Sequence, residues 1–126
     1  RWESIAGDVY GQNLGEPTVG GYNANTWSDG SRTARFGCFR AYGCNNFDED
    51  VAEAVELFAE GRYEFIRNLL NPQSDYYQNS LGEVRGDIIL TPEVAEDWAA
   101  RYRGKVELLY EYGFITEEDY QRVSFS

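Results

Sequence analysis

The sequence predicts a mainly helical fold, a small bundle of four to five helices preceded by a long, irregular N-terminal arm rich in glycine and aromatic residues. Apolar residues recur every three to four positions in residues 47–70, which is the spacing of an amphipathic helix. Residues 91–113 begin with helix-starting residues and end on a glycine. Residues 1–46 hold most of the glycines and show no sustained helical period. A chain of 126 residues predicts one domain, residues 1–126.

The arm, residues 1–46, favours irregular loops or one or two short strands, because turn-forming glycines interrupt it repeatedly. Its many aromatic residues indicate that it packs on another surface, either the chain's own helices or another subunit. Cys38 and Cys44 are spaced to close a small loop, and a disulfide between them predicts an oxidising compartment. Two reduced, buried thiols are the alternative. No zinc site is expected, because the sequence has two cysteines and no histidine.

Residues 47–70 are predicted to be helical, with Gly61 either kinking the helix or dividing it in two, and with Asn71-Pro72 ending it. A further segment is expected to run from Ser74 or Asp75 to Val84, and residues 87–90 are expected to enter the core as an apolar connector. The predicted buried stripe of the first helical stretch consists of Phe47, Val51, Val55, Phe58, Phe65 or Ile66, and Leu69.

The clearest helix begins at Thr91-Pro92-Glu93, with a capping threonine followed by proline at the first helical position. Gly113 suits the residue just after its end. A last short helix is expected to start at residues 116–119 and to carry Tyr120 and Val123. The buried stripe of the long helix is predicted to be Ala95, Trp98, Ala99, Tyr102, Val106 and Leu109.

Eleven basic and twenty-two acidic residues give a net charge of −11, which disfavours nucleic acid and anionic membranes as partners. A basic protein, a cation or solubility alone fits this charge better. The absence of histidine excludes Ser-His-Asp and Cys-His sites. The acidic runs 48–50 and 117–119 are expected to lie on solvated surface at helix starts, where the helix dipole favours them. No enzymatic activity, metal or cofactor is therefore expected.

The sequence contains no methionine, so we expect that processing has removed a leader ahead of Arg1. No apolar run approaches the ~18 residues that a membrane-spanning helix needs. The chain is accordingly expected to be soluble, with no direct membrane insertion.

Two segments of the arm are candidate binding sites. A patch of basic and aromatic residues predicts a protein-docking surface, with intramolecular pairing to the acidic helices as the alternative. The docking patch consists of Arg32, Arg35, Phe36, Phe39, Arg40 and Tyr42. Separately, the ring and amide-rich residues 20–31 are compatible with carbohydrate binding through Tyr22, Trp27 and Asp29, although ordinary turn chemistry explains the same residues.

Residues 59–84 contain a G-x-Y-x-x-I-R-x-L-L-x-P pattern followed by further helical sequence. The pattern is carried by Gly61, Tyr63, Ile66, Arg67, Leu69, Leu70 and Pro72. This run resembles the helical, Q-type extrinsic subunits of algal and plant photosystem II. The resemblance implies a four-helix bundle in the thylakoid lumen that docks on the membrane complex. The aromatic arm and the cysteine loop depart from that bundle.

The sequence therefore predicts a non-enzymatic accessory subunit that docks on and stabilises a larger assembly. The assembly that the resemblance implies is a photosystem, on its lumenal side. A secreted module that binds carbohydrate or another small ligand is the alternative. Both hypotheses place the chain in an oxidising compartment.

The disulfide leads to the first testable prediction. If Cys38 and Cys44 are bonded, reduction adds the mass of a hydrogen pair to the intact chain, because each sulfur takes up one hydrogen atom. Intact mass spectrometry with and without reductant measures this difference. An unchanged mass would contradict the disulfide and remove the main argument for an oxidising compartment.

Overall fold

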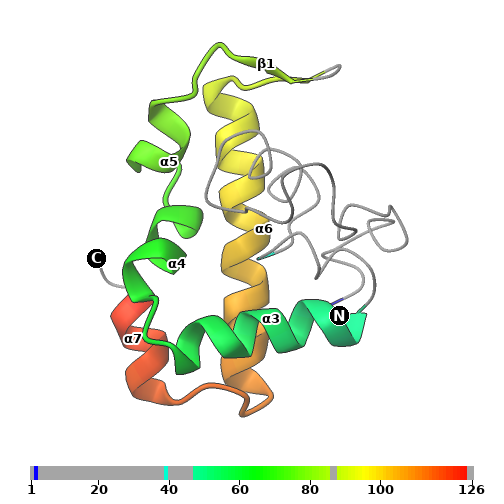
Figure 1. Cartoon of the computed structure of the whole chain (residues 1–126), viewed down its shortest axis with the longest axis vertical. Helices are drawn as coiled ribbons and strands as arrows, with labels where there is room; N and C mark the ends of the chain where they lie inside the picture. The colour runs from blue at the N-terminus through cyan, green and yellow to red at the C-terminus, as the bar shows by residue number, and fades with distance from the viewer. Residues whose placement is uncertain (1, 3–38, 40–46, 86–87, 125–126) are drawn as a thin grey trace.

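The computed structural model of the chain describes Trp2, Phe39 and residues 47–85 and 88–124. These residues are mainly helical, which confirms the predicted class (Figure 1). The elements are α3 (Phe47–Ala59), α4 (Tyr63–Leu70), α5 (Asp75–Gln78), β1 (Val84–Arg85), β2 (Ile88–Ile89), α6 (Pro92–Glu111) and α7 (Glu117–Ser124).

Helix α6 is the long central element, and α4 is the helix that connects the others to it. Helix α4 contacts α6, α7, α3 and α5. Helix α3 runs across α6 near its C-terminal end, whereas the β1–β2 pair lies at the opposite end of α6 (Figure 1). The end of α6 that leads into α7 is therefore well separated from the hairpin.

Gly61 divides the first helical stretch into two helices, one of the two outcomes that the sequence predicted. Gly61 has a φ of 72°, in the left-handed region that glycine enters without steric cost. Its amide donates to the Phe58 carbonyl at 3.0 Å, and the Arg62 amide donates to the Leu57 carbonyl at 3.0 Å. These two bonds form a Schellman motif, which satisfies the last carbonyls of α3 and turns the chain into α4.

The segment expected to be helical up to Val84 is helical only from Asp75 to Gln78, so this prediction was wrong in extent. Gly82 has a φ of 87°, and its amide donates to the Leu90 carbonyl at 2.8 Å. The backbone that follows pairs as antiparallel strands, with Val84 opposite Ile89. Because these backbone groups bond across a hairpin, they are not available to extend a helix.

Helices α6 and α7 begin as the sequence predicts. The Thr91 hydroxyl accepts a hydrogen bond from the Val94 amide at 3.2 Å, and Pro92 is the first helical residue. At the start of α7, the Asp119 amide donates to the Thr116 hydroxyl at 3.0 Å, and the Thr116 amide donates to the Asp119 carboxylate at 3.1 Å. This reciprocal pair is a capping box. All six residues of the predicted α6 stripe are buried.

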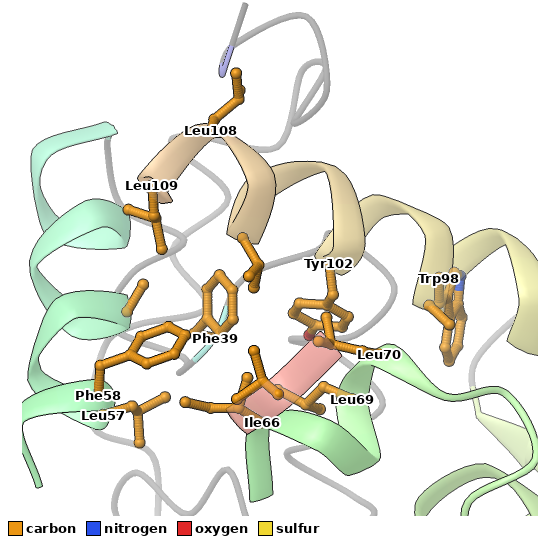
Figure 2. Close-up of a cluster of buried hydrophobic side chains, with 14 of the residues drawn as sticks. Phe39, Leu57, Phe58, Ile66, Leu69, Leu70, Trp98, Tyr102, Leu108 and Leu109 are labelled. Atoms are coloured by element: carbon orange, nitrogen blue, oxygen red, sulfur yellow. The ribbon is translucent and has the colours of Figure 1, made fainter. Parts of the chain in front are cut away.

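The core lies where α3, α4 and α6 meet and is rich in aromatic rings (Figure 2). The ring of Phe39 packs edge-on against Tyr102, with 5.2 Å between centroids. In α3, Ala54 and Leu57 are fully buried, whereas Val51 and Val55 of the predicted stripe are only partly buried. The buried face of α3 is therefore rotated by about one residue from the predicted one.

A buried ion pair accounts for this rotation. Asp50 and Lys105 are both fully buried, and the Lys105 ammonium lies 2.6 Å from an Asp50 carboxylate oxygen. The indole N–H of Trp2 donates to the same oxygen at 3.1 Å. Asp50 was expected on solvated surface with its acidic neighbours; it instead shares the buried face with Ala54 and Leu57, four and seven residues further along.

Burial strongly affects the lysine of this pair. Desolvation lowers the pKa of the Lys105 ammonium, although the neighbouring Asp50 carboxylate acts to raise it. The ammonium also lies 5.1 Å from the centre of the Trp2 ring, a cation–π arrangement that stabilises the charge. The pair thus joins α3, α6 and Trp2 at one buried point.

Removing the ammonium is predicted to destabilise the protein strongly. Lys105→Met keeps the side-chain length but leaves the Asp50 carboxylate buried without its cation, so we expect a loss of about 3–5 kcal/mol in the free energy of unfolding. Urea unfolding followed by circular dichroism measures the change.

Two further variants make this comparison specific. Arg62→Met breaks the exposed Arg62–Glu60 pair, 4.0 Å apart, and is expected to cost less than about 1 kcal/mol. The double change Asp50→Leu with Lys105→Met removes both charges and is expected to recover much of the loss. If Lys105→Met cost no more than Arg62→Met, the central role of the buried pair would be refuted.

Candidate interaction surface

Three large aromatic side chains are exposed where α6 ends. The exposed fractions of Tyr110, Tyr112 and Phe114 are 38%, 48% and 53%. We call these three residues the aromatic edge. Exposed large apolar side chains at one end of a helix are a candidate site of interaction.

The backbone that carries the aromatic edge is fixed by a second Schellman motif. Gly113 has a φ of 83°, and its amide donates to the Tyr110 carbonyl at 3.0 Å. The Phe114 amide donates to the Leu109 carbonyl at 2.9 Å. Gly113 therefore ends α6 as the sequence predicted, and the turn holds Tyr112 and Phe114 on either side of this glycine.

Helix α7 supports the same end of α6. The rings of Tyr110 and Tyr120 are stacked, with centroids 4.6 Å apart and planes 7° from parallel. The Tyr63 hydroxyl donates to the Asp119 carboxylate at 2.7 Å, which ties the first turn of α7 to the first turn of α4. Partial burial acts to raise the pKa of Asp119, but hydrogen bonds from Tyr63 and Thr116 outweigh it and lower that pKa below its ordinary value.

A groove of about 620 Å³ lies between α4, α6 and α7 and shares Tyr120 with the aromatic stack. We call it the α4–α6–α7 groove. Its apolar lining includes Leu70 and Pro72 from the α4 end, Val106 from α6, and Val123 from α7. Its charged lining consists of Arg67, Glu96, Arg103 and Glu107.

The two arginines of the groove bind the C-terminal ends of two helices. Arg103 donates to the Leu70 carbonyl at 2.9 Å and to the Glu96 carboxylate at 2.6 Å. Arg67 donates to the Arg122 carbonyl at 2.9 Å. Because the last carbonyls of a helix lack partners within the helix, these contacts stabilise the ends of α4 and α7 as well as shaping the groove.

The surface next to the aromatic edge is acidic. The carboxylates of Glu107 and Glu111 at the end of α6, and of Glu117 and Glu118 at the start of α7, belong to exposed residues. In the part of the chain that the structure describes, no group of three or more His, Cys, Asp or Glu side chains is arranged to hold a metal ion. The surface thus combines exposed rings with negative charge.

The docking patch predicted in the arm is described at one residue. Phe39 is 1% exposed and packs in the core against Tyr102, so its side chain is covered by this chain's own helices. The other residues predicted for binding or for the disulfide lie outside the described residues. These are Arg32, Arg35, Phe36, Arg40 and Tyr42, the alternative ligand-binding Tyr22, Trp27 and Asp29, and Cys38 and Cys44.

The aromatic edge and the groove were not among the sites predicted from the sequence. The edge had a local signal, because Tyr110, Tyr112 and Phe114 fall outside the buried stripe of the long helix. The groove had none, since its charged residues come from α4 and α6, whose partnership depends on the tertiary fold.

No protein-family model matches this sequence, and neither the curated proteins nor the solved structures include a significant match. Across the described helices, none combines the length and the apolar character needed to cross a membrane. The resemblance of residues 59–84 to the Q-type extrinsic subunits therefore rests on the sequence pattern alone.

The lowered pKa of Asp119 predicts a pH-dependent contribution to stability. A carboxylate whose folded-state pKa is depressed stabilises the fold above its unfolded value, near 3.8, and loses that contribution as the pH falls through the folded-state pKa. We expect Asp119→Asn to lower stability at neutral pH and to reduce the loss of stability on acidification. Urea unfolding at neutral pH and at a pH below 3.8 measures both effects.

Asp75→Asn, at the exposed start of α5, is the matched control for this experiment. It leaves the Tyr63–Asp119 contact in place, so its acid-induced loss of stability should follow that of the wild type. An Asp119→Asn variant with the wild-type dependence on pH would refute the stabilising role of the carboxylate.

Proposed function

We propose that this chain is a non-enzymatic accessory subunit that docks on a larger protein assembly and stabilises it. The observation that carries the proposal is the aromatic edge, with Tyr112 and Phe114 each about half exposed on one helix end. Tyrosine and phenylalanine are enriched in the buried centres of protein interfaces, where single aromatic side chains contribute much of the binding energy.

The aromatic edge is also ordered before a partner binds. The Gly113 turn fixes its backbone, and the stacked Tyr110–Tyr120 pair joins it to α7. Helix α7 is in turn bonded to α4 through Tyr63 and Asp119. A surface ordered before binding loses little conformational entropy when a partner covers it, which favours affinity.

Charge indicates the kind of partner. Residues 1–46 hold four basic and four acidic residues, so the whole excess of negative charge belongs to residues 47–126, which carry the edge. Exposed carboxylates of Glu111, Glu117 and Glu118 lie on the elements that flank it. The partner we propose is therefore a protein surface with an apolar pocket surrounded by basic residues.

The assembly proposed is a photosystem on its lumenal side. This part of the proposal is supported by the resemblance of residues 59–84 to the Q-type extrinsic subunits. The helices that the resemblance covers, α4 and α5, are followed by the long α6, so a bundle of this general kind is compatible with it. The arm residues Arg32, Arg35, Phe36, Arg40 and Tyr42 stay a predicted second contact with the same assembly.

The docking proposal is tested by substituting the edge. The double variant Tyr112→Ser with Phe114→Ser removes two exposed rings without touching a buried residue. We expect it to lower retention in the native complex about tenfold or more, since an aromatic anchor at an interface contributes about 2 kcal/mol. Retention is measured by native purification of the tagged chain and quantification of the proteins that accompany it.

Ile89→Ser is the matched control, because Ile89 is 54% exposed but lies on the hairpin at the opposite end of α6. It should be retained like the wild type, and all variants should keep their helical circular dichroism. Equal retention of the edge variant and the control would refute docking through the aromatic edge. A complex that depends on the edge but contains no photosystem subunit would refute the proposed assembly and leave docking intact.

A further inference from the structure

Arg67 differs from the other cations whose side chains the structure describes, Arg62, Arg101, Arg103, Lys105 and Arg122. Its guanidinium donates one hydrogen bond, to the Arg122 carbonyl, and has no carboxylate partner among the described residues. A guanidinium has five N–H donors in a rigid plane, so most of the Arg67 donors have no partner among the described residues. By contrast, carboxylates lie beside Arg62, Arg101, Arg103, Lys105 and Arg122.

The donors of Arg67 lie in a groove of mixed polarity that also has apolar side chains in its lining. Leu70, Val106 and Val123 line the groove but are each less than a tenth exposed, whereas Pro72 and Tyr120, which also line it, are partly exposed. The volume of about 620 Å³ falls within the range of small-molecule sites, which are about 300–1,000 Å³, largely apolar and equipped with a few polar groups. A cation at the side of such a groove favours a ligand with one anionic end and an apolar body.

The remaining charges limit the anion to a single negative charge. Arg103 is paired with Glu96, so these two residues largely cancel. Glu107 also lines the groove, and the C-terminal ends of α4 and α7, which carry partial negative charge, lie there too. A phosphate with two charges would be repelled by these groups, whereas a carboxylate matches the guanidinium in shape and charge.

We propose that the α4–α6–α7 groove binds a small amphiphilic monocarboxylate. Its carboxylate pairs with Arg67, and its hydrocarbon body lies on the partly exposed side chains of Pro72 and Tyr120. This site adjoins the aromatic edge through the Tyr110–Tyr120 stack, but the proposal does not depend on the proposed docking function. Glu107 acts against the ligand's charge, which keeps multiply charged anions out of the groove.

The test compares sodium octanoate with 1-octanol, two probes with the same chain length and different head groups. Two-dimensional NMR of the full chain follows the backbone amides during each titration. Octanoate should cause saturable shifts centred on residues 67–72, 103–107 and 120–124. Octanol should bind at least about tenfold more weakly than octanoate, because it cannot form the charge-assisted pair with Arg67. Equal affinity for the two probes, or shifts centred elsewhere, would overturn the proposal.

Two variants test the charges separately. Arg67→Gln should weaken octanoate binding about tenfold or more and leave octanol binding unchanged, whereas Arg62→Gln, outside the groove lining, should behave as the wild type. Glu107→Gln should strengthen octanoate binding by roughly threefold, since it removes a like charge from the groove. Unchanged octanoate affinity in a folded Arg67→Gln variant would overturn the proposal. If Arg67→Gln does not fold, octanoate affinity that is unchanged or lower in Glu107→Gln would overturn the proposal.

Discussion

The arrangement of the helices depends on the buried pair of Asp50 and Lys105. Two ions without water must be matched in position, because the cost of desolvating them is recovered only at short distance and with further hydrogen bonds. The ammonium and the carboxylate meet at 2.6 Å, and the Trp2 indole adds a donor to the same oxygen. A shift of α3 by one residue would separate the charges. The pair therefore fixes the register of α3 against α6, and through the Gly61 turn it also fixes where α4 begins.

The parts of the fold that the sequence predicts correctly are those determined by neighbouring residues. The start of α6 follows from Thr91 and Pro92, and its end follows from Gly113. The errors arise where distant residues decide the structure. The segment after Gln78 turns into a hairpin because Gly82 bonds to Leu90. A sequence-based prediction places Asp50 on the surface, because charged residues are usually exposed. The lysine that makes its burial possible lies 55 residues away in the sequence.

The candidate surfaces also divide into one that neighbouring residues determine and one that depends on residues distant in sequence. The aromatic edge is a local feature, readable as rings that fall outside the buried stripe of one helix. The groove joins α4 to α6 and α7, and its character depends on which carboxylates approach which arginines. Arg67 and Arg103 look alike in the sequence, and each donates to a backbone carbonyl, but Arg103 also pairs with Glu96, whereas Arg67 has no carboxylate partner among the described residues. Both arginines stabilise a helix end, and this difference in carboxylate partners, which the composition does not show, is what makes Arg67 the proposed anion-binding residue.

The contact between Trp2 and Lys105 also constrains the order in which the chain acquires its structure. The ammonium lies over the ring of Trp2, so this contact closes a loop that includes residues 3–104. During synthesis, the indole is made long before the helix that will cover it. It must stay without its final neighbours until α6 has left the ribosome. Helices α3 and α4 can form earlier from local contacts, but the charge pair that locks them in register is completed late.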